Sequence, residues 1–597
     1  MANAFPGPIQ HVVVLMLENR SYDNILGALY ADTTPPSGQS TLNGLAQEIA
    51  DGTVANQTTP TQMGTNTTPT YPPTCIPIYD PGEYFCDMAQ QIMGTSEIPD
   101  SYPYGTDNED YPPAAAQAMT GFLTNYSQIG GLSHPTQASV PAENLPDVMN
   151  YFTPDQLPVT SFLAQNFGVS DVWFASVPSQ TFTNRTFVLC AAPAVHTEIL
   201  GHQFSLVDDP QYLTDSWSSG PSLLDLLDNA LPSNTALSPP YWKVYFHDHS
   251  LGIETVDTLD SLANQTTNSN LATFDNSDWP AGQIPSQLSC TSMPTTFVED
   301  VLQSNGGSLP PFAFIEPRYF NDKAYNPLPP NSNHPGGSNY PSPSNLSGVA
   351  GNTNPPIDVA MGELLLMQVY NLLQASDYWG STLLIVTYDE HGGVYDHVVP
   401  PTATAPDVPA ASNIADGAVS PFNFAILGGR VPAILISQYI DAASTVRPQG
   451  GGAYDHTTII QTVRQLFAPN AAPLTARDQN AASLTGTNGV LQPTAVNQTG
   501  PYAGALVAAP GTLVFTNTTP QTAFASAGVN PAITVTDTTG DDWFTWSANF
   551  TTLAGGTTSV AITVTPNSGL SGNYNGSITV TGGSSAGTAT INLFAFL

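Results

Sequence analysis

The chain has few charged residues, and positive charge is the scarcest kind. Lys and Arg number 9 against 47 Asp and Glu, which gives the 597-residue chain a formal net charge of −38 at pH 7. Charged residues make up only 9% of the chain, whereas globular proteins usually contain ~25%. An acidic chain without a basic stretch is repelled by nucleic acid and by anionic membranes, so we expect neither as a partner.

Long hydrophobic runs and paired cysteine motifs are also missing. No stretch reaches the ~18–20 apolar residues of a membrane span, so we expect no stable membrane insertion. The apolar run 11–17 is strand-sized and lacks a basic flank, which argues against a signal peptide, so no leader is visible. The cysteines at 75, 86, 190 and 290 form no C-x-x-C pair, which argues against structural zinc. Cys75 and Cys86 are close enough in sequence to bridge a local loop, although four cysteines allow three pairings.

The shortage of charge favours a secreted, extracellular protein. An acidic environment is one explanation, because carboxylates that are protonated near pH 3–4 would reduce the net charge. An ordinary acidic secreted protein explains the composition equally well.

Strands and helices alternate over most of the chain. Apolar runs predict strands at 11–17, 242–246, 312–316, 382–388 and 431–437. Helical spacing predicts helices at 21–30, 221–229, 297–304, 359–375 and 456–467. The alternation predicts an α/β fold with a layered, mainly parallel sheet flanked by helices. The segment 31–115 is rich in Thr, Pro, Asn and Gly, and we expect it to be a long irregular insertion.

The pattern changes after residue 477, which we take as the end of the first domain. Residues 478–508 have the composition of a linker. Residues 509–597 contain short alternating runs and no helical pattern, which predicts a small all-β sandwich. This last segment has no Lys, Arg, His or Glu, so we expect no catalytic chemistry there. Its stretch PNSGLSGNYNGSITVT resembles the immunoglobulin-like accessory domains that occur beside secreted bacterial hydrolases.

Acidic side chains follow two predicted strands directly. Glu18 and Asn19 follow the first strand, and Asp389 and Glu390 follow the strand at 382–388. If these strands are parallel neighbours, their carboxyl ends meet at one edge of the sheet, where sites form. Carboxylate and amide oxygens suit a divalent cation. The alternative is that these acids only cap the helices that follow.

The scarce basic residues and one polar turn are further candidates. Arg185 and Arg430 are among the basic residues at predicted strand ends or turns, where they either bind an anionic group or pair with buried carboxylates. The stretch VPSQTFTNRTF, 177–187, places hydroxyl groups at a predicted strand-to-helix turn. A hydroxyl beside a metal can attack phosphorus, although a Thr in a polar turn is usually a helix cap.

Several motifs together resemble one enzyme family. HVVVLMLENRSYDNILG looks like the opening motif of the phosphoesterases that include bacterial and plant phospholipases C and bacterial acid phosphatases. Further stretches follow in family order: PSQTFTNR, WKVYFHDH, FAFIEPRYF, SNHP, DVAMGE, TYDEHGGVYDHVVPP, GGRVPAILIS and YDHTTI. The resemblance covers roughly 8–470, apart from 31–115, and implies an alkaline phosphatase-like fold with 1–477 as the catalytic domain.

The resemblance also implies roles for individual residues. One divalent metal ion would be held by Glu18, Asn19, Asp389 and Glu390. Thr181 would be the nucleophile and form a phosphothreonine intermediate.

Other polar residues of these motifs would contact the substrate. The resemblance implies that His334, His247 and His249 contact the phosphoryl oxygens or assist the leaving group. We expect the remaining substrate contacts from Asn184, Arg185 and His391. For His391, Asp396 and His397, shaping the loop or supporting the metal ligands is an alternative.

The chain departs from the family pattern at three places. Gln180 and Thr183 stand where proline is common, and Glu83 falls where a histidine often stands. A carboxylate beside a phosphate has to be protonated, which agrees with acidic working conditions.

The sequence therefore predicts metal-dependent hydrolysis of a phosphate ester. The substrate is a phospholipid, as for a phospholipase C, or a small phosphomonoester, as for an acid phosphatase. The alternative from another class is a non-catalytic surface binding or adhesion protein on an inactive phosphoesterase fold, which the Asn- and Thr-rich surface would suit.

Overall fold

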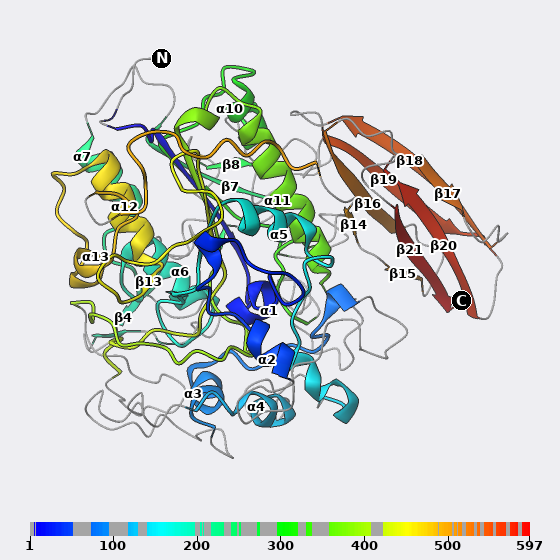
Figure 1. Ribbon diagram of the computed structural model, residues 1–597, viewed down its shortest axis with the longest axis horizontal. Helices are drawn as coiled ribbons and strands as arrows, with labels where there is room; N and C mark the ends of the chain where they lie inside the picture. Colours follow the sequence, from blue (N-terminus) through cyan, green and yellow to red (C-terminus); the bar gives the residue numbers. More distant parts are fainter. Residues whose placement is uncertain are drawn as a thin grey trace.

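The described part of the molecule, for which we use a computed structural model, contains a large sheet with helices and four smaller sheets (Figure 1). The structure describes residues 5, 7–51, 73–94, 118–128, 140–197, 203–205, 207, 217–231, 240–247, 250–251, 271–274, 295–319, 330–336, 357–407, 422–486, 489–503, 507–509, 512–515, 521–529, 534–537, 543–552, 557–568, 573–582 and 588–596.

The large sheet has eight strands in the order β12-β2-β11-β10-β1-β9-β7-β8. Their bounds are β1 His11–Leu17, β2 Gly168–Ser170, β7 Trp242–Phe246, β8 Leu271–Thr273, β9 Phe312–Ile315, β10 Thr382–Tyr388, β11 Ala433–Ile436 and β12 Ser444–Thr445. β11 is antiparallel to both of its neighbours, and the other adjacent pairs are parallel. The predicted mixed α/β architecture with a mostly parallel sheet is confirmed.

Continuous apolar runs form the central strands because both faces of the sheet are covered. Every residue of β10 is buried, as is every residue of β1 after His11. The five predicted strands are all present, but the one at 431–437, which is β11, runs against its neighbours.

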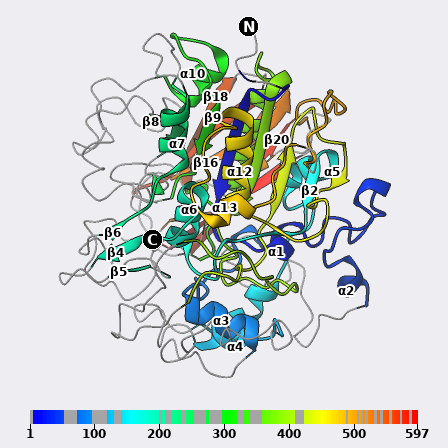
Figure 2. The same cartoon turned by 90° about the vertical axis from the view of Figure 1, so that its left-hand side faces the viewer.

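Helices cover the two faces in separate groups. On one side, α6 (Thr181–Cys190), α7 (Leu223–Ala230), α12 (Thr457–Phe467) and α13 (Ala476–Asn480) contact one another. With this side toward the viewer, Figure 2 shows α12 and α13 in front of the sheet. On the other side, α11 (Val359–Gln374) contacts α5 (Pro158–Asn166) and α10 (Phe297–Leu302).

Beyond the carboxyl end of β1 lies a third group of helices (Figure 1). Its members are α1 (Tyr22–Leu26), α2 (Ala46–Asp51), α3 (Phe85–Met93) and α4 (Phe122–Gln128). Two of them, α2 and α3, fall in the segment 31–115, so the described part of the expected irregular insertion is partly helical. The reason is visible in the spacing of Phe85, Met88, Ala89 and Ile92, which are all buried on one helical face.

Short turns and small sheets complete this part of the chain. The 3-10 turns are η1 (Ser37–Gln39), η2 (Pro73–Cys75), η5 (Ala142–Met149) and η7 (Trp379–Ser381). The small sheets pair β13 (Tyr454–Asp455) with β3 (Trp173–Phe174), and β4 (Val195–Thr197) with β5 (Gln203–Ser205) and β6 (Trp217–Ser218).

The C-terminal part consists of two four-stranded sheets. One contains β14 (Val507–Ala509), β16 (Gln521–Val529), β19 (Thr557–Pro566) and β18 (Phe544–Thr552). The other contains β15 (Thr512–Phe515), β21 (Thr588–Phe596), β20 (Asn573–Thr581) and β17 (Thr534–Asp537). Val560 and Ile562 of the first sheet share one apolar core with Ile578 and Ile591 of the second. An immunoglobulin-like character stays a prediction.

The segment before the C-terminal sheets is bound to the large α/β part. Tyr502 donates its backbone N–H to Asn371 Oδ1 at 2.8 Å, and the Tyr370 hydroxyl donates to the Gly500 carbonyl at 2.6 Å. Tyr502 also belongs to the main apolar core, where its ring lies 5.3 Å from that of Phe162. The end of the segment 489–503 is therefore bound to α11, while its earlier residues bond to Leu484, Gln438 and Tyr439.

Cysteines and surface charge complete the comparison with the sequence. Cys75, Cys86 and Cys190 are thiols, so the suggested Cys75–Cys86 bridge does not form; Cys290 lies outside the described residues.

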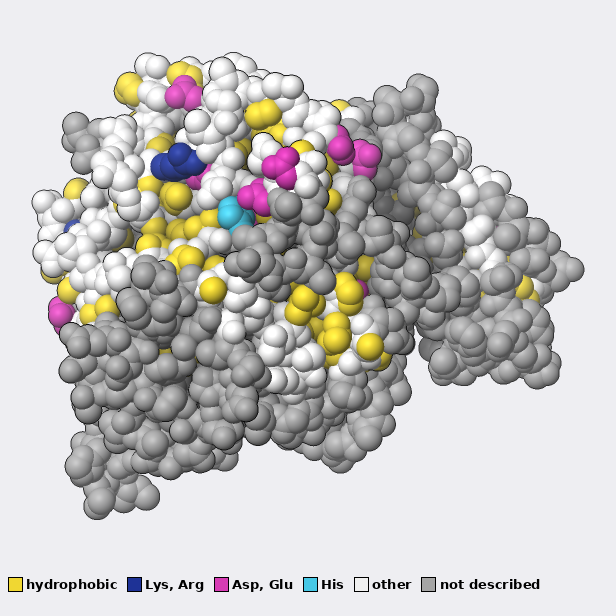
Figure 3. Space-filling view, turned by 60° about the horizontal axis from the view of Figure 1, so that its bottom comes forward, with side chains coloured by type: hydrophobic (Ala, Val, Ile, Leu, Met, Phe, Trp, Pro, Cys, Tyr) yellow, Lys and Arg dark blue, Asp and Glu magenta, His cyan; other side chains and the backbone are white. Residues whose placement is uncertain are grey.

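Among the described helices, none has the length and apolar character needed to cross a membrane. Among the described residues on the face that Figure 3 presents, charged side chains are few beside polar and apolar ones.

A buried glutamate joins two helices on one face of the sheet. Glu363 of α11 accepts hydrogen bonds from the backbone N–H groups of Val159 at 2.6 Å and Thr160 at 3.1 Å, in the first turn of α5. The residue before this helix, Leu157, provides no side-chain cap. Burial raises the pKa of Glu363 to about 7, although these hydrogen bonds oppose the shift.

We predict that Glu363 makes the protein less stable as the pH rises. A carboxyl group whose pKa is raised on folding retains its proton more tightly in the folded state, so stability is fully present below about pH 4.5 and is lost as the pH passes about 7. The full loss is roughly 3 kcal/mol at most. Urea unfolding at pH 5 and pH 8.5 measures this loss of unfolding free energy.

The variant Glu363→Gln should show a smaller decline in unfolding free energy between these two pH values than the wild type. Asp377→Asn, which changes an exposed acid just after α11, is the control and should leave the decline unchanged. An identical pH dependence in Glu363→Gln and wild type would contradict the prediction.

Candidate active site

Three acidic side chains leave the same edge of the sheet. β1 lies between β9 and β10 and is parallel to both, with Leu17 opposite Tyr388 and Leu15 opposite Ile315. Glu18, Glu316 and Asp389 follow these strands and are all buried. The arrangement that the sequence predicted for Glu18 and Asp389 is thus present, and Glu316 adds a third carboxylate.

Asn19 connects three distant segments at this edge. Its backbone N–H donates to Asp389 Oδ1 at 3.1 Å, and its Nδ2 donates to Glu83 Oε1 at 2.8 Å. Its Oδ1 accepts a hydrogen bond from Thr181 Oγ1 at 3.2 Å. Asn19 has a φ of 54°, a left-handed conformation that Asn tolerates better than most residues. The structure therefore joins Thr181 through Asn19 to Asp389. We call Glu18 with Asn19 the first acidic pair and Asp389 with Glu390 the second.

Thr181 is the first residue of α6 and is 4% exposed. The turn before it is held by Asn184, which donates to the carbonyls of Ser179 at 2.7 Å and Gln180 at 3.1 Å. Asn184 Oδ1 also accepts from the Val177 N–H at 3.1 Å. These bonds orient the turn that carries Thr181, while the substrate contact expected of Asn184 stays a prediction.

Arg185 lies one helical turn after Thr181 and pairs with two of the acids. Its Nε donates to Asp389 Oδ2 at 3.0 Å and its Nη1 to Glu316 Oε1 at 3.1 Å, with all three side chains fully buried. Its Nη2 has no hydrogen-bond partner among the described residues. Arg185 therefore neutralises the acids at the edge and leaves one donor for a further anion.

Glu18 is the acid whose surroundings indicate a missing partner. It is 1% exposed, and its Oε1 has no hydrogen-bond partner in the described part of the chain. Burial raises the pKa of Glu18, and the charge of Asp389 adds to the shift, whereas His334 opposes it. A buried carboxylate oxygen without a partner is costly. A divalent cation with oxygen ligands would satisfy this oxygen, and Asp389 is close enough for its charge to act on Glu18. Among the described residues at this edge, Asp80, Glu83 and His334 are the ones whose ligand atoms lie within 4.8 Å of one another, as a metal site needs.

Glu390 follows Asp389 and is fully buried. Its Oε2 accepts from the Gly392 N–H at 2.6 Å and lies 3.8 Å from His391 Nδ1. Gly392 has a φ of +65°, and a Cβ there would lie 2.0 Å from the carbonyl oxygen of Asn19. The turn after the second acidic pair therefore requires glycine in order to approach the first pair.

A second acidic group lies on the other side of Asn19. Glu83 Oε1 is 3.8 Å from His334 Nε2, and Asp80 Oδ1 is 3.8 Å from His334 Nδ1. Burial raises the pKa of both acids, which favours their protonated forms. Asp80 was not expected at the site from the sequence, because the composition of 31–115 gives no pattern that places it there.

The other predicted histidines occupy different positions. His247 donates from Nδ1 to the Glu316 carbonyl at 3.0 Å and stacks on Phe274, and burial lowers its pKa well below the usual range. His391 donates from Nε2 to Gln91 Oε1 at 2.9 Å, and burial lowers its pKa to about 4. Both rings are therefore neutral near pH 7. His249 lies outside the described residues.

Sequence analysis missed Glu316 as a member of the site. The same signal that marked Glu18 and Asp389 was available, because Glu316 stands at the carboxyl end of a predicted parallel strand. Its carboxylate also contacts Ser250 and Tyr319, so it is held from three sides together with Arg185.

Comparison with known proteins decides the family. The sequence profile of the phosphoesterase family matches residues 9–468. The chain belongs to the phosphoesterase family. Non-specific phospholipase C6 of Arabidopsis thaliana is 29% identical over 486 residues, which make up 81% of this chain and 72% of that protein. Phospholipase C B of Mycobacterium tuberculosis is 27% identical over 80% of this chain and 77% of that protein.

The resemblance inferred from the motifs is confirmed, and the chain is a phosphoric ester hydrolase by family. This membership does not favour an inactive binding protein. A solved endo-fucoidan hydrolase, MfFcnA4, is 16% identical over 16% of this chain and 13% of its own, with a TM-score of 0.11, which is too low to bear on the fold.

We predict that Gly392→Ala disrupts the site. The added Cβ would collide with the Asn19 carbonyl and force the two acidic pairs apart. Displacing catalytic groups by ~1 Å can cost about 100-fold, so kcat/KM for p-nitrophenyl phosphate should fall by about that factor.

Gly486→Ala is the matched control, because Gly486 also has a positive φ but has no atom closer than 3.6 Å to a Cβ. It should retain wild-type kcat/KM. Wild-type activity in Gly392→Ala would show that the close approach of the two segments is not needed.

Proposed function

We propose that the protein hydrolyses phosphate esters in a metal-dependent reaction through a phosphothreonine intermediate. The observation that carries the proposal is the contact of Thr181 Oγ1 with Asn19, which is joined in turn to Asp389. A hydroxyl group at the start of a helix thus lies beside a set of buried oxygen ligands.

The metal would be held by Glu18, Asn19, Asp389 and Glu390. A divalent cation in this position would lower the pKa of the Thr181 hydroxyl and stabilise negative charge on the phosphoryl oxygens. The unpartnered Glu18 Oε1 supports one such cation.

Thr181 would act as the nucleophile. In the first displacement its Oγ1 bonds to phosphorus while the bond from phosphorus to the leaving oxygen breaks, and the hydroxyl proton is released. In the second displacement water attacks the phosphothreonine, which frees the phosphoryl group and restores the hydroxyl. The first turn of α6 favours this position, because its N–H groups and dipole stabilise an anion.

Two further residues would serve the substrate. Arg185 has a free donor, Nη2, for a phosphoryl oxygen, and its charge is fixed by two carboxylates. His334 and Asn19 both contact Glu83, His334 Nε2 at 3.8 Å and Asn19 Nδ2 at 2.8 Å. From this position His334 would protonate the leaving oxygen, a task that water would otherwise perform.

The substrate would be a phospholipid or a small phosphomonoester. The names of the relatives, both phospholipases C, favour a phospholipid. We also propose that the enzyme is secreted, with an acidic environment as one setting, and that the C-terminal sheets are an immunoglobulin-like accessory domain.

We predict that Thr181→Ala lowers turnover by on the order of 10⁴-fold or more, because removing a nucleophile removes the reaction path. The rates are measured with p-nitrophenyl phosphate and with phosphatidylcholine. Thr181→Ser retains a hydroxyl and should keep most of the activity.

Thr183→Ala is the control for position, because Thr183 is buried in the same helical turn. It should stay within about threefold of wild type. Near wild-type turnover in Thr181→Ala would mean that another group attacks phosphorus.

We predict one divalent cation per chain and loss of activity on its removal. Dialysis against a chelator should lower turnover by at least about 100-fold, and addition of a divalent metal should restore it. Elemental analysis of the wild type gives the metal and its stoichiometry.

Glu18→Gln should lower the metal content, whereas Glu363→Gln, a change of a buried glutamate elsewhere, should not. Full activity in the chelated protein would contradict the metal-dependent mechanism.

A further inference from the structure

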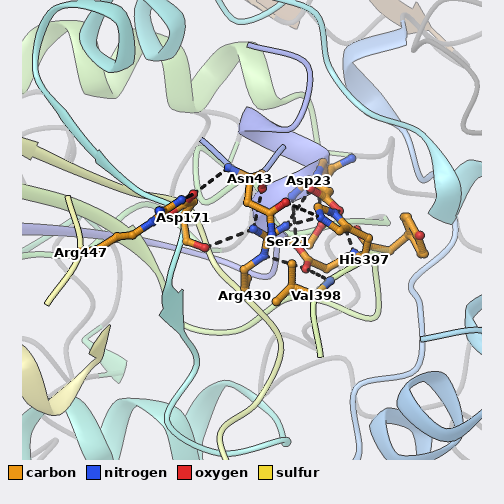
Figure 4. A network of polar contacts seen from close by, with 11 residues as sticks. Ser21, Asp23, Asn43, Asp171, His397, Val398, Arg430 and Arg447 are labelled. Carbon is orange, nitrogen blue, oxygen red and sulfur yellow. Dashed lines mark hydrogen bonds and ion pairs between the residues drawn. The ribbon is translucent and has the colours of Figure 1, made fainter. Parts of the chain in front are cut away.

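A cluster of charged side chains, of which Figure 4 labels Asp23, His397 and Arg430, lies beyond the segments that carry the acidic pairs. Arg430 donates from Nε to Asp396 Oδ1 at 2.8 Å and from Nη2 to Asp23 Oδ1 at 2.9 Å. His397 Nδ1 lies 2.6 Å from the other oxygen of Asp23. Asp23, Asp396 and Arg430 are at most 1% exposed. None of these residues belongs to the ligand set described above.

The cluster joins the segment that carries Glu18 and Asn19 to the segment that carries Asp389 and Glu390, a few residues after each pair. Asp23 lies in α1, a few residues after Asn19, and Asp396 lies in the loop after Glu390. Direct bonds between the segments support the cluster, since the His397 N–H donates to Asp23 Oδ2 at 2.8 Å.

A hydroxyl group adds to the same junction. Ser21 Oγ donates to the Tyr395 carbonyl at 2.6 Å and accepts from the Asn24 N–H at 3.1 Å, so it caps α1 and holds the loop at once. On the other side of the ligands, the same two segments are joined by the pairing of β1 with β10. Each ligand pair is therefore fixed at both ends.

Arg430 depends on its planar guanidinium group to make this connection. Besides the two carboxylates, its Nη1 donates to the carbonyl of Asn43 at 2.8 Å, and the group lies 4.4 Å from the centre of the Tyr22 ring. A lysine would supply the charge at one point but not the fork that reaches two carboxylates.

The charged groups of the cluster shift one another's pKa values. The pKa of His397 is lowered by burial but raised overall by the neighbouring Asp23. The pKa of Asp23 is raised by burial but lowered overall by His397 and Arg430. Burial raises the pKa of Asp396, and the charge of Arg430 opposes that shift. Asp23, Asp396 and His397 have ligand atoms within 4.8 Å of one another, as a metal site would need. The guanidinium of Arg430 already pairs with both carboxylates, so a metal ion there would be repelled.

We propose that Arg430, through Asp23 and Asp396, positions the two acidic pairs for metal binding. The inference rests on the proposed function, because it assigns Glu18, Asn19, Asp389 and Glu390 to one cation. Substitution of residues that orient metal ligands without contacting the metal typically changes metal affinity by ~10–100-fold. Arg430 is a positioning residue in this sense and does not touch the substrate.

The test compares Arg430→Lys with Lys243→Met. Lys243 forms another buried ion pair, 2.6 Å from Asp300, on β7 and away from the ligands. Both variants are examined as full chains by circular dichroism and thermal unfolding. The Kd for Mn²⁺ and for Mg²⁺ is measured by calorimetry on chelator-treated protein, and kcat and KM with p-nitrophenyl phosphate at several metal concentrations.

Arg430→Lys should fold and bind the metal about 10–100-fold more weakly, with kcat recovering in part at saturating metal and KM little changed. Lys243→Met should lose thermal stability but keep the wild-type Kd within twofold. Asp396→Asn, which keeps an acceptor for Arg430 Nε, should weaken metal binding less than Arg430→Lys does.

Two results would overturn the inference: a wild-type Kd in Arg430→Lys, or an equal loss of affinity in Lys243→Met, which would reduce the effect to general destabilisation. A wild-type protein that holds no divalent metal by elemental analysis and still hydrolyses the substrate would refute the proposed function, and the inference with it. Weak binding in Arg430→Lys beside tight binding in the wild type supports both.

Discussion

The register between β1 and β10 is the constraint on which the site depends. Leu17 lies opposite Tyr388, and the backbone N–H of Asp389 donates to the Leu17 carbonyl at 3.2 Å. Residues 370 positions apart, Asn19 and Asp389, become hydrogen-bonded neighbours as a result. A slip of one residue would turn alternate side chains to the opposite face of the sheet and separate the two acidic pairs.

Carboxylates gathered at one buried edge of the sheet need positive charge beside them to neutralise their negative charge, and the chain has few basic residues. Six of its nine Lys and Arg residues pair with Asp or Glu among the described contacts. Arg185 serves the edge itself, and Arg430 serves the segments beyond it. Of the two tasks that the sequence suggested for the basic residues, binding an anion or pairing with carboxylates, ion pairs within the fold account for most.

The sequence predicted the parts of the site that follow from local pattern. Unbroken apolar runs located β1 and β10, and the residues directly after a parallel strand must lie at its carboxyl edge. The contact of Glu83 with Asn19 and the use of Asn184 to hold the turn before Thr181 were not predictable in this way. Both depend on how distant segments pack, and the antiparallel direction of β11 likewise depends on the path of the chain and not on its own residues.

The contacts of residues 489–503 with the α/β part determine where the chain can be cut to make a shorter expression fragment. Tyr502 fills a place in the main core beside Phe162, and its backbone is paired with Asn371 of α11. A recombinant fragment that stops at residue 477 would leave these aromatic rings and an amide group exposed to water. An expression fragment meant to preserve the hydrolase should therefore extend past Tyr502, so that this side chain keeps its place in the main apolar core.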